Sequence, residues 1–218
     1  DVWYSFNASS GTYTFIDLTS GNPAVLGVEL FSNDCTGASV YCGTGGDHMV
    51  ATTPGTTYYV RVFSTIATPF SICVSAENPY DECANALGIP LNLQGNCPAN
   101  ATAGTTQNAQ PSAGGTCGGG SGDIWYQVYS GSATAMVVNL TSTGASGLGI
   151  QVLNACGGAV VYCGTGLSHG FVTDPGATYW IRVFSAGEGG FTICASQTSG
   201  SPDCNGVPGG PATPGNYC

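Results

Sequence analysis

Apolar and polar residues alternate with a period of two in two almost identical stretches of the chain. In "TTYYVRVFS" (56–64), the aliphatic residues Val60 and Val62 fall on one face and Arg61 falls on the other. "ATYWIRVFS" (177–185) repeats the pattern. Because successive side chains of a β-strand point to opposite faces of its sheet, both stretches are predicted to be strands whose aliphatic face packs on a core.

These two strands are part of a longer internal repeat. Four blocks recur in the same order at an offset of 121 or 122 residues: "DVWYSF" (1–6) as "DIWYQV" (123–128), "DCTGASVYCGTG" (34–45) as "ACGGAVVYCGTG" (155–166), "PGTTYYVRVFS" (54–64) as "PGATYWIRVFS" (175–185), and "PFSIC" (69–73) as "GFTIC" (190–194). Each block is short, rich in β-branched and aromatic residues and bounded by turn residues, which is typical of strands. Many short strands separated by turns predict an all-β chain of two tandem β-sandwiches.

The two copies differ at their starts. The second copy is preceded by a 40-residue segment (83–122), here called the lead-in, which contains the strand-like stretch "LGIPLNL" (87–93). The first copy begins at Asp1 without a lead-in, so we expect its missing segment either in a longer array of which the chain is a window or in a neighbouring molecule. The expected organisation is a truncated sandwich (1–80), a complete sandwich (81–198) and a Cys-bounded, Gly/Pro-rich linker (199–218).

The chain has only two Lys or Arg residues, Arg61 and Arg182, at matching points of the repeat. Each copy also begins with a strand of the form Asp–x–Trp–Tyr, at Asp1 and at Asp123. A guanidinium group binds a carboxylate through two parallel hydrogen bonds and can lie flat on an aromatic ring. We therefore predict structural ion pairs between Asp1 and Arg61 and between Asp123 and Arg182. A ligand-binding role for the arginines is the alternative.

Eleven cysteines in 218 residues indicate an oxidising compartment and a disulfide-braced fold. The preferred scheme leaves Cys218 alone and pairs Cys35 with Cys42, Cys73 with Cys83, Cys97 with Cys117, Cys156 with Cys163, and Cys194 with Cys204. A second scheme pairs Cys83 with Cys194 and Cys204 with Cys218, and it leaves Cys73 alone. Spacing does not decide between the two schemes, and in both of them the odd cysteine indicates truncation or an intermolecular bond.

The charge of the chain narrows the classes of partner that it is expected to bind. A net charge of −10 with two cations argues against nucleic acid and against an anionic membrane surface. No apolar run is long enough to span a membrane.

The sequence also lacks familiar catalytic patterns. No GxSxG, HExxH or P-loop motif is present, so we expect neither an enzyme nor a cofactor. A calcium site built from Asp1 or Asp123 and loop carbonyls is a weaker alternative. Trp3, Trp125 and Trp180 are candidate rings for stacking on a sugar or another ligand.

Several motifs resemble a known family. "DVWYSF…GTYTF", "PGTTYYVRVFS" and "FSICV…NPYDECANAL" resemble the repeated β-sandwich modules of large secreted surface proteins of the Bacteroidota type. Those modules are similar to the bacterial pre-peptidase C-terminal domain, a jelly-roll-like sandwich. "DCNGVPGGPATPGNYC" (203–218) is similar to a Cys-bounded linker of the same proteins. The resemblance implies two jelly-roll-like sandwiches, export by a type IX secretion route and a location at or outside the cell surface.

From these features we expect an extracellular structural or adhesive repeat protein without catalytic residues, forming part of a surface fibre or filament. Its partners would be further copies of itself or neighbouring modules of a longer chain. The alternative is a carbohydrate- or protein-binding module appended to a secreted enzyme, with a surface glycan or protein as its ligand.

Overall fold

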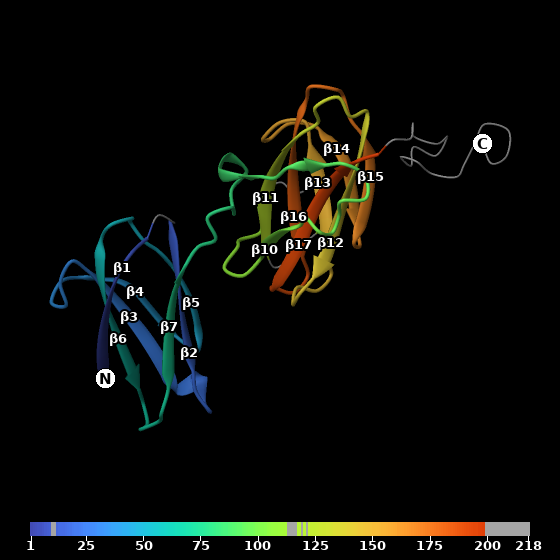
Figure 1. The fold of residues 1–218 in the computed structure, drawn as a ribbon. Helices are drawn as coiled ribbons and strands as arrows, with labels where there is room; N and C mark the ends of the chain where they lie inside the picture. Colours follow the sequence, from blue (N-terminus) through green and yellow to red (C-terminus); the bar gives the residue numbers. More distant parts are fainter. Residues whose placement is uncertain (10–11, 113–116, 119, 121, 199–218) are drawn as a thin grey trace. The chain divides into compact units, whose positions relative to one another are not determined.

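The computed structural model describes residues 1–9, 12–112, 117–118, 120 and 122–198, so the expected linker (199–218) lies outside the described residues. The chain divides into two compact units, unit 1 (Asp1–Pro79) and unit 2 (Tyr80–Cys218) (Figure 1). The regular structure consists of strands and two short 3-10 helices, η1 (Pro23–Val25) and η2 (Cys83–Asn85). The predicted all-β class is confirmed.

Unit 1 is a sandwich of a four-stranded sheet, β1-β6-β3-β4, and a three-stranded sheet, β5-β2-β7. The period-two alternation buries Val60 and Val62 of β6 in a core shared with Ile16 of β2 and Val28 of β3, as predicted. The strands are β1 (Val2–Asn7), β2 (Tyr13–Thr19), β3 (Leu26–Ser32), β4 (Ser39–Thr44), β5 (Asp47–Ala51), β6 (Thr57–Ser64) and β7 (Ser71–Ala76).

Unit 2 is a larger sandwich of two five-stranded sheets. One sheet has the order β14-β13-β16-β11-β8, and the other has the order β10-β17-β12-β15 with β9 also paired to β17. Ile181 of β16 and Val138 of β12 lie fully buried between the sheets. The strands are β8 (Leu87–Gly88), β9 (Leu91–Asn92), β10 (Thr102–Thr105), β11 (Gly122–Tyr129), β12 (Ala135–Ser142), β13 (Gly149–Leu153), β14 (Val160–Thr165), β15 (Ser168–Val172), β16 (Thr178–Ser185) and β17 (Gly190–Gln197).

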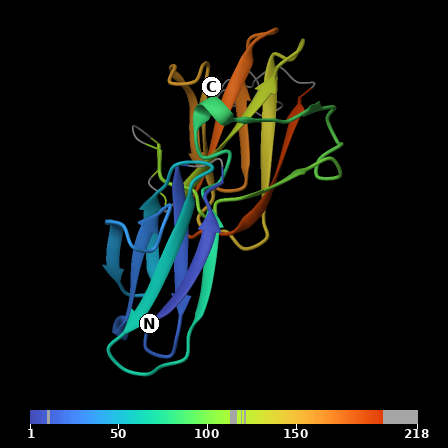
Figure 2. The same ribbon diagram turned by 90° about the vertical axis from the view of Figure 1, so that its left-hand side faces the viewer.

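The lead-in supplies the three strands of unit 2 that have no counterpart in unit 1. β8 pairs in parallel with β11, β9 pairs in parallel with β17, and β10 pairs antiparallel with β17. The lead-in therefore passes from one sheet to the other and extends both, as the green segment in Figure 2 shows. In unit 1 the matching sheet edges are β1 and β7, and within the described residues no further strand pairs with either.

The lead-in decides whether the Asp–x–Trp–Tyr strand is buried. Trp125 and Tyr126 on β11 are 6% and 0% exposed, whereas Trp3 and Tyr4 on β1 are 42% and 38% exposed. The four-residue motif is nearly the same in both units, so the difference in burial comes from the covering segment.

Three disulfides tie the lead-in to the sandwich of unit 2, and they replace the pairings predicted from spacing. Cys83 bonds to Cys156, Cys97 to Cys194, and Cys117 to Cys163. Because the lead-in crosses both sheets, it meets cysteines up to 97 residues away, whereas spacing arguments favoured near neighbours. The predicted bonds that are therefore wrong are Cys73–Cys83, Cys97–Cys117, Cys156–Cys163 and Cys194–Cys204 of the preferred scheme and Cys83–Cys194 of the second scheme.

The cysteines of unit 1 are unbonded. Cys35, Cys42 and Cys73 are free and exposed, so the predicted hairpin bond between Cys35 and Cys42 is also wrong. The loop that separates these two residues does not bring their side chains together. Cys204 and Cys218 lie outside the described residues.

Candidate functional site: the two arginine clusters

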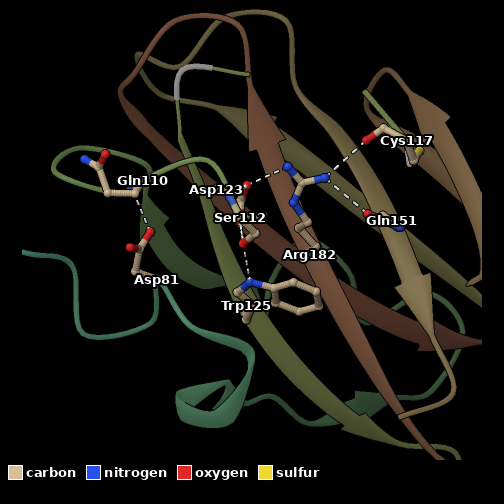
Figure 3. A network of polar contacts seen from close by, with 8 residues as sticks. All are labelled: Asp81, Gln110, Ser112, Cys117, Asp123, Trp125, Gln151 and Arg182. Atoms are coloured by element: carbon tan, nitrogen blue, oxygen red, sulfur yellow. Dashed lines mark hydrogen bonds and ion pairs between the residues drawn. The ribbon is translucent and has the colours of Figure 1, made fainter. Parts of the chain in front are cut away.

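Arg182 lies in the middle of its sheet and holds a buried polar cluster. Its β16 position pairs with Trp125 of β11 on one side and with Gln151 of β13 on the other. Its Nη2 donates to Asp123 Oδ2 at 2.6 Å, and its Nη1 donates to Gln151 Oε1 at 3.1 Å and to the Cys117 carbonyl at 3.2 Å (Figure 3). The side chains of Arg182 and Asp123 are only 2% and 1% exposed. The predicted ion pair between them is present.

The lead-in supplies further hydrogen bonds to the Asp123 carboxylate. The Ser112 backbone N–H donates to Asp123 Oδ2 at 2.9 Å, and the Ser112 hydroxyl donates to Oδ1. Trp125 Nε1 in turn donates to Ser112 Oγ at 3.0 Å (Figure 3). Burying a charge is costly unless it is paired and hydrogen-bonded, so these lead-in contacts offset part of the cost of burying the Asp123 side chain.

The same contacts recur in unit 1 in an open form. Arg61 Nε donates to Asp1 Oδ2 at 2.8 Å, and its Nη1 donates to Glu29 Oε2 at 3.0 Å. The predicted ion pair between Asp1 and Arg61 is present, but these side chains are 44% and 38% exposed. Exposed pairs of this kind contribute little to stability because water screens them.

Sequence reasoning missed the third member of each cluster. Glu29 and Gln151 occupy equivalent places, each directly across from the arginine on the neighbouring strand. The available signal was the polar residue in the middle of two otherwise apolar strands, "LGVELF" and "LGIQVL". The carboxylate of Glu29 lies beside the exposed Arg61. The neutral amide of Gln151 lies beside the buried Arg182. This keeps the buried cluster close to neutral.

Both guanidinium groups also lie over an aromatic ring, as predicted. The Cζ atom of Arg61 is 5.5 Å from the ring centroid of Phe63, and that of Arg182 is 5.5 Å from that of Phe184. Apart from Nε of Arg182, which has no acceptor among the described residues, the polar atoms of this arginine are engaged inside the fold. Arg182 is therefore a structural residue with no face open to a ligand.

Two of the three candidate stacking tryptophans are covered. Trp125 is buried in a small cluster with Cys83 and Leu153, and Trp180 packs partly buried against the same cluster. Trp3 is exposed and lies 5.4 Å, centroid to centroid, from Phe31. Of these three rings, Trp3 is the most exposed and therefore the one most available for stacking on a sugar.

The described histidine and acidic side chains do not gather at one place. In the described parts of the chain, no three His, Cys, Asp or Glu side chains are grouped as ligands of one metal ion. His48 and His169 contact loop carbonyls through Nε2, of Gly45 at 3.2 Å and of Gly166 at 2.9 Å. Burial lowers the pKa of His169 below its usual range, so this imidazole is neutral at neutral pH. These contacts are those of loop-bracing residues.

Two solved structures are weakly similar to this chain. The pre-peptidase C-terminal domain of a collagenase from Bacillus anthracis is 18% identical, with 50% of this chain and 93% of that chain covered and a TM-score of 0.33. The A223 turret protein of Sulfolobus turreted icosahedral virus is 10% identical, with 88% and 95% covered and a TM-score of 0.24. At such scores neither likeness bears on the fold. No curated protein matches the chain.

In the part of the chain that the structure describes, no helix combines the length and apolarity that a membrane span needs.

The comparison with family models is more informative than the one with solved structures. A family model described as galactose-binding-domain-like and associated with type IX secretion matches residues 1–72 and 79–192, which together make up most of the chain. The chain therefore belongs to the galactose-binding-domain-like family associated with type IX secretion, which confirms the family inferred from its strand motifs.

Proposed function

We propose that this chain is a non-catalytic, load-bearing module of an extracellular fibre. Its family association implies a secreted or cell-surface protein. The observation that carries the proposal is the bond between Cys97 in the lead-in and Cys194 on the last strand of unit 2. A force along the chain enters unit 2 at Tyr80 and leaves after β17, so this bond lies directly across the force path.

The covalent route through unit 2 is short while its disulfides are intact. It runs from Cys83 to Cys97 and then crosses directly to Cys194, a position 97 residues further along the chain. The residues between Cys97 and Cys194 therefore carry no tension even if the sandwich unfolds. A cross-link placed in this way limits extension under load, which is a useful property in a fibre.

Single-molecule force spectroscopy tests the proposal. With disulfides intact, unit 2 should lengthen by no more than the short stretch before Cys97. Under reducing conditions the same unit should release the 97-residue loop, which adds roughly 320–350 Å of contour length at about 3.3–3.6 Å per residue. The described residues of unit 1 contain no disulfide, so its unfolding step should not depend on the reductant and gives an internal reference. Equal extensions of unit 2 with and without reductant would remove the basis of the proposal.

Sugar binding at Trp3 is the second candidate, favoured by the galactose-binding-like family description and by the exposure of this ring. A glycan array with the intact chain tests it. Saturable binding that is lost on Trp3→Ala and kept on Trp180→Phe would favour a binding module over a purely mechanical one.

A further inference from the structure

Unit 1 carries three free thiols at places where unit 2 carries disulfides. Cys35, Cys42 and Cys73 are free and exposed. Each lies 121 residues before a bonded cysteine of unit 2, namely Cys156, Cys163 and Cys194, whose partners are Cys83, Cys117 and Cys97 of the lead-in. Unit 1 therefore keeps the sandwich half of each bond, and no lead-in cysteine is bonded to it among the described residues.

Unit 1 also exposes apolar residues on two of its edge strands. Val2, Trp3 and Tyr4 on β1 and Val74 on β7 are between 37% and 46% exposed. β1 and β7 are the end strands of their sheets, and the matching strands of unit 2, β11 and β17, are the ones that bind the lead-in. An unpaired apolar edge readily accepts another strand. The free thiols and the open edges thus mark one docking surface for a segment of the lead-in kind.

The chain itself contains a second segment of that kind. "CANALGIPLNLQGNC" (83–97) and "CNGVPGGPATPGNYC" (204–218) have the same length, a cysteine at each end, and Gly and Pro at the same two internal positions. Their offset is 121 residues, the same as that of the sandwich cysteines. The second segment follows β17 as the first follows β7. The tail therefore matches the first part of the lead-in, from Cys83 to Cys97.

We propose that the tail (203–218) of one copy docks on unit 1 of a second copy, with Cys204 bonded to Cys35 and Cys218 bonded to Cys73. This inference rests on the proposed fibre function and gives it an assembly rule. The step from unit 1 to the lead-in of unit 2 within one chain is repeated between chains, so copies join head to tail. A contact between two different surfaces that does not close on itself produces a filament.

The Gly/Pro-rich composition of the tail is compatible with this role. In unit 2 the equivalent contacts are two-residue strands, β8 and β9, so little strand propensity is required. Pro208 takes the place of Leu87 and cannot donate a ladder hydrogen bond, while Ala212 and Thr213 take the places of Leu91 and Asn92 and keep their N–H groups. Attachment is therefore carried mainly by the two disulfides, and strand addition supplies few hydrogen bonds.

The tail matches the lead-in only as far as Cys97. Cys117, which bonds to Cys163 in unit 2, lies outside this match, so the proposal assigns partners to Cys35 and Cys73 and none to Cys42. Each of the two new bonds removes two protons and two electrons from a pair of thiols. A small disulfide such as oxidised glutathione accepts them and becomes two thiols.

The experiment mixes isotope-labelled and unlabelled full-length chains whose three unit 2 disulfides are already formed. A glutathione redox buffer is then added. We expect a reductant-sensitive ladder of oligomers on a non-reducing gel. Mass spectrometry of non-reduced peptides should identify Cys35–Cys204 and Cys73–Cys218 links that join one labelled and one unlabelled partner. The double variant Cys204→Ser/Cys218→Ser should remain monomeric, and the control Cys42→Ser should form the same ladder as the unchanged chain.

Three results would overturn the inference: a ladder that persists in the double variant, links with exchanged partners such as Cys35–Cys218, or links found only within one chain. The force measurement on single chains does not depend on the tail. A normal force response without a ladder would therefore reject the docking alone, and a failed force response would reject the proposed function.

Discussion

Arg182→Met is expected to destabilise unit 2 by about 3–5 kcal/mol, because it leaves the Asp123 carboxylate buried without its cation. The free energy of unfolding is measured by guanidinium denaturation followed by tryptophan fluorescence. In a Trp3→Phe background the two remaining tryptophans, Trp125 and Trp180, both lie in unit 2 and report on that unit alone.

The matched control is Arg61→Met in unit 1. Arg61 contacts two carboxylates, but the cluster is open to water, so we expect the free energy of unfolding of unit 1 to fall by only about 0–1 kcal/mol. The unfolding of unit 1 is measured by circular dichroism. Equal losses from the two substitutions would show that burial by the lead-in does not set the strength of the cluster.

Removing the Cys97–Cys194 bond is the second change with a large expected effect. The double variant Cys97→Ala/Cys194→Ala should lower the free energy of unfolding of unit 2 by about 2–5 kcal/mol, because this bond closes the longest of the three loops, with a sequence separation of 97 residues. The measurement is the same fluorescence titration in the Trp3→Phe background.

The control for that variant is Cys73→Ala, the equivalent of Cys194 in unit 1. Cys73 is free and exposed, so its replacement should change stability by no more than about 0.5 kcal/mol. An unchanged denaturation midpoint in the unit 2 double variant would mean that the lead-in is held by other contacts.

The alternation of apolar and polar residues was enough to predict the structural features that depend only on residues close together in the sequence. The period-two alternation around Val60 and Val62 predicted the core face of β6, and the repeat extended that prediction to β16. The same alternation placed each arginine on the face opposite the core, and the Asp–x–Trp–Tyr strand then offered its carboxylate as partner. These predictions follow from the two-residue period of a strand and need no knowledge of the tertiary fold.

The features that the sequence did not predict depend on where the lead-in runs. Cys97 and Cys194 meet only because the lead-in crosses from one sheet to the other, and no spacing rule contains that path. Trp3 and Trp125 belong to nearly the same motif, yet only the second is covered. Glu29 and Gln151 were missed because their role depends on strand pairing, which the repeat alone did not specify.

The lead-in closes unit 2 by bonding to both sheets of the sandwich. The most direct test is a disulfide map of the native chain, digested without reduction at low pH to prevent exchange and read by mass spectrometry. If the lead-in closes unit 2 in this way, the map contains linked peptides for Cys83–Cys156, Cys97–Cys194 and Cys117–Cys163. Links between near neighbours, such as Cys97–Cys117 or Cys156–Cys163, would contradict it.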